Sequence, residues 1–183
     1  MTDSLKLVPS VIALGMFDGM HLGHRALVRR CVEIARDMGC QSVVYTFRNH
    51  PRSVFATEPV PLMSAAQRES IMKQLGVDRV DMVEFTREFA SLPPKAFLET
   101  IVARYDVRAV VVGEDYTFGY RGQGNAQTLK CLGQEMGFQV EVIPFVRLYG
   151  EKVSSTRVRE ALANGDTQLA RALLGSVQAN REP

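Results

Sequence analysis

The sequence has few of the features that mark several large classes of proteins. Its three cysteines, Cys31, Cys40 and Cys131, are scattered and form no C-x-x-C pair, which argues against a zinc site and a disulfide framework. No apolar run approaches the length needed to span a bilayer, and no hydrophobic signal segment precedes Val11. These absences predict a protein of the reducing cytoplasm with no membrane partner.

The charge balance excludes another class. The chain has 22 basic and 20 acidic side chains, so its net charge is +2, and it contains no polybasic block. Nucleic acid is therefore not expected as a partner.

With 183 residues and neither internal repeats nor low-complexity blocks, the chain is expected to form one domain over residues 1–175, followed by a polar tail at 176–183.

The stretch VIALGMFDGMHLGH, residues 11–24, is the first candidate site. Residues 11–17 are apolar enough for a buried strand, Asp18-Gly19 predicts a turn, and a helical pattern follows. A strand that turns through glycine into a helix brings free backbone N–H groups and the positive end of the helix dipole together, which favours phosphate. His21 and His24 lie three residues apart, so both could donate N–H groups from one face.

Strand-like and helix-like segments alternate along the rest of the chain. Strands are expected at 42–47, 79–85, 108–112 and 138–145, and helices at 22–38, 64–75, 94–105 and 126–136, with two short ones after Ser154 and Asp166. This order predicts an α/β, Rossmann-like fold: a parallel five-stranded sheet of order 3-2-1-4-5, counted along the chain, with helices on both faces. Ligands of such sheets bind at the carboxyl ends of the strands.

Two loops are expected at that edge. Residues 48–61 contain three prolines together with His50, Arg52 and Phe55. Residues 113–125, GEDYTFGYRGQGN, contain four glycines, three aromatic residues and one arginine. Such a loop is suited to close on a ligand and to stack against it.

Each candidate also has an ordinary structural interpretation. The two histidines could be solvated helix-end residues, or half of a metal site with His50 as the available third ligand. Ser154 to Arg159 could be a simple capped helix, and Asp18 could only set a turn. Taken singly, Phe47, Phe55 and Phe97 are more typical of a hydrophobic core than of a ligand pocket.

The combination of motifs is more specific than any one of them. GMFDGMHLGH near the start and VSSTRVR near the end resemble the paired phosphate motifs of the H-x-G-H nucleotidyltransferase superfamily. Together with TFRNHPRSVF, FTREFASLPPKAFL, VVGEDYTFGYRGQGN, GEKVSSTRVREAL and the closing LLG, over residues 8–175, they resemble the FAD synthetase module of bacterial riboflavin kinase/FMN adenylyltransferase.

The resemblance implies transfer of AMP from ATP to the phosphate of FMN, giving FAD and pyrophosphate with the help of Mg²⁺. It assigns the nucleotide site to Gly15, Phe17, Asp18, Gly19, His21, Gly23, His24 and Asp115. It assigns the departing pyrophosphate to Ser155, Thr156 and Arg159. It assigns the isoalloxazine pocket to Phe47, Arg52, Phe55, Phe97 and Phe118.

The sequence departs from this family at two points. Met16 stands where the family has an asparagine, which could remove a ligand contact or alter the acceptor. Only eight residues follow LLG, so the chain is expected to be either a stand-alone adenylyltransferase or the first domain cut from a bifunctional protein. In either case, phosphorylation of riboflavin is not expected. The alternatives are a related transferase acting on nicotinamide mononucleotide or phosphopantetheine, and a non-catalytic flavin- or nucleotide-binding module. The oligomeric state is not predicted.

Overall fold

A computed structural model describes residues 7–55 and 61–175. The proposed polar tail lies outside these residues. Five parallel strands form the central sheet in the order β3-β2-β1-β4-β7, which confirms the predicted order. The strands are β1 (Pro9–Leu14), β2 (Gln41–Phe47), β3 (Arg79–Val83), β4 (Asp106–Gly113) and β7 (Gln139–Ile143).

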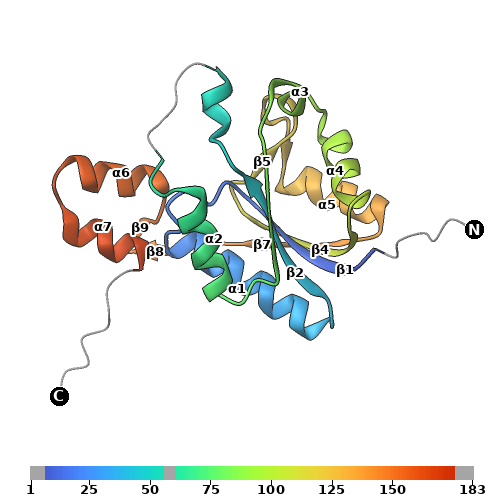
Figure 1. The fold of residues 1–183 in the computed structure, drawn as a ribbon, viewed down its shortest axis with the longest axis horizontal. Coiled ribbons are helices and arrows are strands. Elements are labelled where there is room, and N and C mark those ends of the chain that lie inside the picture. The colour runs from blue at the N-terminus through green and yellow to red at the C-terminus, as the bar shows by residue number, and fades with distance from the viewer. Residues whose placement is uncertain (1–6, 56–60, 176–183) are drawn as a thin grey trace, which may run out of the picture.

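Helices cover both faces of this sheet, as expected (Figure 1). On one face lie α1 (Leu22–Asp37) and α2 (Ala65–Gln74), and on the other lie α4 (Pro94–Val102) and α5 (Ala126–Met136). Side chains alternate along β1: Val11 and Ala13 pack under α1, whereas Ile12 and Leu14 pack under α4 and α5. The central strand is therefore apolar on both sides, as the unbroken hydrophobic run predicted.

The helix boundaries follow local signals. Ser64 and Gln67 form the predicted capping box before α2, and α5 ends at Gly137, which adopts the left-handed conformation. The last two helices, α6 (Ser155–Ala163) and α7 (Thr167–Leu174), are capped by Ser154 and Asp166. Both pack on a small separate core that also includes Leu22 of α1, at one side of the molecule (Figure 1).

Four details differ from the expectation. β1 ends at Leu14 rather than residue 17, because the backbone turns over immediately afterwards. The loops hold short elements: η1 (Pro51–Phe55), α3 (Arg87–Ala90) and η2 (Tyr120–Gly122). The glycine-rich loop forms the hairpin β5 (Thr117–Phe118) and β6 (Gly124–Asn125). A second hairpin, β8 (Arg147–Leu148) and β9 (Glu151–Lys152), precedes α6.

Candidate active site

The turn between β1 and α1 has an unusual backbone. Phe17 and Met20 have φ of 52° and 41°, a region that residues other than glycine rarely adopt, and Gly19 has φ of 82°. Both large side chains are fully buried. Because each such residue costs roughly 1–3 kcal/mol, this conformation persists only where packing holds it. Phe17, predicted in the nucleotide site, therefore lies in the core beneath the turn and lines neither cavity described below.

His21 caps the helix that follows this turn. Its Nδ1 accepts a hydrogen bond from the backbone N–H of His24 at 3.3 Å, so the proton of the neutral ring is on Nε2. Burial lowers the pKa of His21 to about 4, which keeps the ring neutral near pH 7. His21 is therefore a neutral ring with an N–H group on Nε2 at the start of α1. Gly23 lies close to this ring, since a Cβ there would lie 3.2 Å from the imidazole Cε1.

His24 stacks on His21, with ring centroids 3.6 Å apart, and meets Phe17 edge-on. Burial lowers its pKa well below the ordinary histidine value. Its Nδ1 is buried and has no hydrogen-bond partner among residues 7–55 and 61–175. Buried polar atoms are almost always paired in folded proteins, and the exceptions often mark functional positions.

Asp18 joins the turn to α6. Its Oδ1 accepts from the backbone N–H of Leu62 at 3.0 Å, and its Oδ2 accepts from Arg159 at 2.6 Å. The Ser155 hydroxyl donates to the carbonyl oxygen of Asp18 at 2.8 Å. Two predicted pyrophosphate ligands thus bind the first phosphate motif in this structure, while the third, Thr156, is exposed and lines neither cavity.

A polar cavity of about 200 Å³ lies where α1 and α6 begin. At the helix starts it is lined by His21, Gly23 and His24 of α1 and its cap, and by Ser154 and Ser155 of α6 and its cap. Asp115 and Lys152 add two charged side chains, and the rest of the wall is apolar: Ile143, Pro144, Phe145, Val146 and Val153. Both helices begin at this cavity, so the positive ends of their dipoles lie beside it. This arrangement suits an anion such as phosphate.

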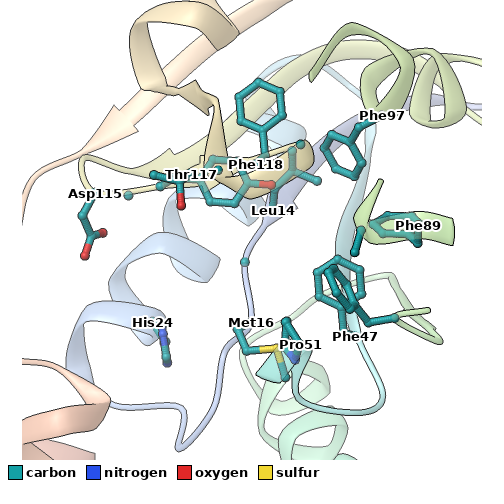
Figure 2. Close-up of a pocket in the computed structure, with 17 residues that line it drawn as sticks. Leu14, Met16, His24, Phe47, Pro51, Phe89, Phe97, Asp115, Thr117 and Phe118 are labelled. Atoms are coloured by element: carbon teal, nitrogen blue, oxygen red, sulfur yellow. The ribbon is translucent and has the colours of Figure 1, made fainter. Parts of the chain in front are cut away.

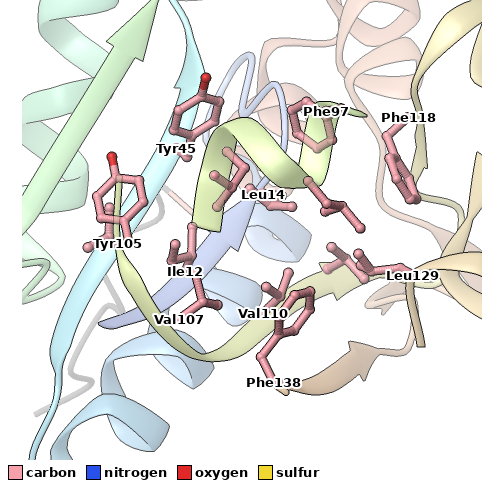
Figure 3. Close-up of a cluster of buried hydrophobic side chains, with 14 residues drawn as sticks. Ile12, Leu14, Tyr45, Phe97, Tyr105, Val107, Val110, Phe118, Leu129 and Phe138 are labelled. Carbon is pink, nitrogen blue, oxygen red and sulfur yellow. The ribbon is translucent and has the colours of Figure 1, made fainter. Parts of the chain in front are cut away.

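An aromatic cavity of about 430 Å³ adjoins it, a volume typical of small-molecule sites (Figure 2). Gly15 and Met16 line it at the end of β1. Six rings in its wall follow one another at centroid distances of 4.9–5.7 Å, in the order Phe85, Phe47, Phe89, Phe97, Phe118 and Tyr116. Phe97 and Phe118 also belong to the hydrophobic core beneath (Figure 3), so this wall is anchored in the fold.

Three of these rings, Phe47, Phe97 and Phe118, were assigned to the flavin pocket from the sequence, and Tyr116 belongs to the loop that was expected to stack against a ligand. Phe85 and Phe89 were not predicted. Phe85 precedes the N-cap of α3 and Phe89 lies within that helix, so no helical spacing relates the two rings in the sequence. Two further candidates do not reach this cavity. Arg52 does not line it, and Phe55 is 63% exposed and lines a separate neighbouring cavity with Tyr120.

A buried arginine that the sequence analysis missed fixes the edge of this site. Arg68 of α2 is only 3% exposed and donates to the carbonyl oxygens of Met16 and Phe47, each at 2.9 Å. The carbonyl of Met16 also accepts from the Thr46 hydroxyl. The ends of β1 and β2 are thereby tied together, and the Met16 side chain lines the aromatic cavity (Figure 2).

His24 and Asp115 line both cavities, so the anion site opens onto the aromatic one. The junction lies at the carboxyl ends of β1 and β4, where the ligands of parallel α/β sheets bind. The fold and the position of the two cavities are typical of nucleotide-binding α/β domains.

Comparison with known proteins identifies the family. The model of the FAD synthetase family matches residues 4–157, and the chain belongs to this family. It is 35% identical over 180 residues to the bifunctional riboflavin kinase/FMN adenylyltransferase of Listeria monocytogenes, covering 95% of this chain and 56% of the relative. It is 39% identical over 167 residues to the protein of the same description from Pseudomonas fluorescens, covering 90% and 54%.

A solved structure is also similar. A Streptococcus pneumoniae chain described as a macrolide-efflux protein matches with a TM-score of 0.84 and 33% sequence identity, over 94% of this chain and 57% of that one. This chain spans about half the length of the curated relatives it matches. In the part of the chain that the structure describes, no helix is long and apolar enough to cross a membrane.

Proposed function

We propose that this chain is an FMN adenylyltransferase, which transfers AMP from ATP to the phosphate of FMN and releases FAD and pyrophosphate. The observation that carries the proposal is the junction of a phosphate-binding cavity with an aromatic cavity at His24 and Asp115. FMN has both of the corresponding parts, a flat aromatic ring system and a phosphate. Membership of the FAD synthetase family supports the same reaction.

The reaction requires positioning more than acid–base chemistry. The second pKa of a phosphate monoester is around 6, so the FMN phosphate is largely ionised near neutral pH and needs no general base. One of its oxygens attacks the α-phosphorus of ATP, and the bond from that phosphorus to the bridging oxygen of the β-phosphate breaks. The electron pair leaves with pyrophosphate. The protein must align the two phosphates and offset the negative charge that builds up.

The polar cavity has groups suited to this task. The Nε2–H of His21 is a neutral donor whose orientation is fixed by the helix cap, and His24 stacks beside it. The first turns of α1 and α6 add backbone N–H groups and their dipoles. Ser155, Thr156 and Arg159 are the proposed ligands of the departing pyrophosphate. Two of them currently contact Asp18, so binding requires exchange of these contacts.

Mg²⁺ is the proposed metal partner of ATP. The described residues include no cluster of three or more histidine, cysteine or acidic side chains that could hold a metal by themselves. Mg²⁺ does not need one, because it is commonly bound by one or two carboxylates together with substrate phosphates and water. Asp115, a carboxylate at both cavities, fits this role. When bound, Mg²⁺ would neutralise charge on the polyphosphate.

The aromatic cavity would receive the isoalloxazine ring. Rings from β2, α3, α4 and β5 converge on it, and large flat ligands stack well on such surfaces. Met16 lies in its wall, and its polarizable thioether can contact an aromatic ring. We propose that Phe47, Phe85, Phe89, Phe97, Phe118 and Tyr116 form the flavin site.

The test is incubation of the purified chain with FMN, ATP and Mg²⁺, with flavin fluorescence as the signal and chromatography of the product. FAD and pyrophosphate are expected in equal amounts. His24→Ala should abolish the reaction, whereas Cys131→Ala, an exposed position on α5, should not affect it. Binding of FMN without FAD formation would favour a non-catalytic flavin module. Absence of FMN binding would favour a transferase with another acceptor.

The cellular compartment is part of the proposal. Cys31, Cys40 and Cys131 are all free thiols, which suits the reducing cytoplasm where FMN and ATP are available. Burial raises the pKa of the Cys31 thiol to about 12, so this cysteine is chemically inert near neutral pH.

A further inference from the structure

The backbone pairing between β2 and β3 ends just before the aromatic cavity. Phe47 and Val83 are the last pair in the register, and the backbone N–H of Arg48 adds one bond to the carbonyl oxygen of Val83 at 2.8 Å. The segments that follow both contribute to the wall of the cavity, through Pro51 on one side and Phe85 on the other. A contact other than strand pairing is needed to hold these two segments together.

The side chain of Asn49 makes this contact. Its Oδ1 accepts from the backbone N–H of Phe85 at 2.8 Å, and its Nδ2 donates to the carbonyl oxygen of Phe85 at 2.9 Å. The amide thus pairs with Phe85 through one acceptor and one donor, as a residue of a neighbouring strand does. Its Nδ2 also lies 3.5 Å from Oγ of Ser53 in η1. Both polar atoms of the amide are engaged, so its orientation is fixed.

This pairing fixes one ring of a three-ring cluster. The ring centroid of Phe85 lies 4.9 Å from that of Phe47 and 5.5 Å from that of Phe89, and the last two are 5.3 Å apart (Figure 2). Phe47 belongs to β2, whereas Phe85 and Phe89 follow β3, so the cluster spans the place where strand pairing ends. Asn49 lines neither cavity, and any effect on a ligand must pass through the residues that it holds.

We propose that Asn49 is a positioning residue for the flavin. Its amide holds Phe85 against Phe47, so that this part of the aromatic wall is formed before the ligand arrives. A preformed wall raises affinity because less order has to be imposed on binding. This inference rests on the proposed function and deepens it, since it names a determinant of flavin affinity outside the lining residues. Other segments line the polar cavity, so ATP binding should not depend on Asn49.

The experiment combines titration with FMN, followed by quenching of flavin fluorescence, with steady-state kinetics of FAD formation. Asn49→Ala removes both bonds to Phe85 and should raise the Kd and KM for FMN about tenfold. The kcat at saturating FMN and the KM for ATP should change less than about threefold, because only ground-state binding of one substrate is affected. General damage to the fold would instead change all of these quantities together.

Asn49→Asp keeps the size of the side chain and the acceptor for the N–H of Phe85, but it loses the donor to the carbonyl oxygen. It should weaken FMN binding by roughly threefold, between the parent chain and Asn49→Ala. This variant keeps the test decisive if Asn49→Ala does not fold.

Ser42→Ala is the matched control, because Ser42 joins the same two strands at their other end. Its hydroxyl donates to Oδ2 of Asp78 at 2.7 Å and accepts from the backbone N–H of Asp78 at 3.0 Å. Ser42 lines neither cavity. Ser42→Ala should lower the melting temperature as much as Asn49→Ala does, but leave FMN affinity within about twofold of the parent chain. An equal loss of FMN affinity in the two variants would overturn the inference.

A double-mutant cycle tests whether Asn49 acts through Phe85. In the Phe85→Ala background the ring is gone, so Asn49→Ala should weaken FMN binding less than about threefold further. Fully additive losses would overturn the inference, because Asn49 would then act on the flavin by another route.

FMN affinity equal to that of the parent chain in both Asn49 variants would also overturn the inference, and so would equal losses of FMN and ATP affinity. The proposed reaction is judged separately. FMN binding that depends on Asn49 without FAD formation supports the inference, and only the transferase assignment fails. If FAD forms and the Asn49 variants bind FMN normally, the inference alone fails. No FMN binding by the parent chain would overturn the inference together with the FMN assignment.

Discussion

Arg159 donates from Nη2 to Oδ2 of Asp18 over 2.6 Å and so connects two motifs that lie 141 residues apart in the sequence. The Asp18 side chain is only 7% exposed, and that of Arg159 is 31% exposed. The pair fixes the start of α6 against the turn that precedes α1. It therefore brings the two helix N-termini to one cavity.

Breaking this pair should destabilise the fold. Arg159→Met leaves the Asp18 carboxylate buried without its partner, and we expect the free energy of unfolding to fall by roughly 2 kcal/mol. Urea denaturation measures the change. In a double-mutant cycle with Asp18→Asn, the coupling energy should exceed about 1 kcal/mol. Strictly additive effects would mean that the contact contributes nothing to stability.

Stability should depend on the protonation of His21. Its pKa is lowered to about 4 in the folded state, so below pH 6.5 the unfolded chain binds a proton that the folded chain does not. The free energy of unfolding should therefore fall as the pH falls from about 6.5 toward 4, by up to about 3 kcal/mol from this residue. Denaturation between about pH 7 and pH 5 measures the slope.

The control for this slope is His21→Asn, because asparagine also caps helices but does not titrate in this range. We expect a shallower pH dependence, with the remainder contributed by His24, whose pKa burial also lowers. Parallel curves for the two proteins would exclude His21 as a source of the pH dependence.

The Gly23→Ala substitution should separate activity from stability. The new Cβ would lie 3.2 Å from Cε1 of His21, so the imidazole must shift by a few tenths of an ångström. Alanine favours a helix by up to about 1 kcal/mol relative to glycine, which offsets the strain. We expect near-normal thermal stability and at least a tenfold lower rate of FAD formation, since misplaced groups cost about that much. A fully active variant would show that the position of His21 is not critical.

Flavin affinity should depend on Phe89 more than on Phe55. Phe89 lies in the wall of the aromatic cavity between Phe47 and Phe97, whereas Phe55 is 63% exposed outside it. Phe89→Ala should weaken FMN binding about tenfold, or 1.4 kcal/mol, and Phe55→Ala less than about twofold. Quenching of flavin fluorescence measures both. A larger loss of FMN affinity with Phe55→Ala would place the isoalloxazine ring outside the aromatic cavity, beside Phe55.

Much of the fold follows from local patterns in the sequence. The apolar runs, the Ser64–Gln67 capping box and Gly137 predicted elements that the structure confirms, because periodicity, caps and turns depend on neighbours in the chain. The strand order was also predictable, since parallel strands joined by right-handed crossovers permit few arrangements. The helix start at His21 and His24 was recognisable from its spacing and glycines.

The side-chain pairings were decided by the tertiary structure alone. Nothing local shows that Phe17 enters the core from a turn with positive φ rather than from the strand, or that Phe55 stays outside the aromatic cavity. The contacts of Asp18 with Arg159 and of Asp115 with Lys152 join residues 141 and 37 positions apart. Such contacts depend on how helices and hairpins pack over the sheet edge, and this packing is set by the whole core. The sequence determined which elements form and where a phosphate is expected, whereas the packing of those elements determined which side chains surround it.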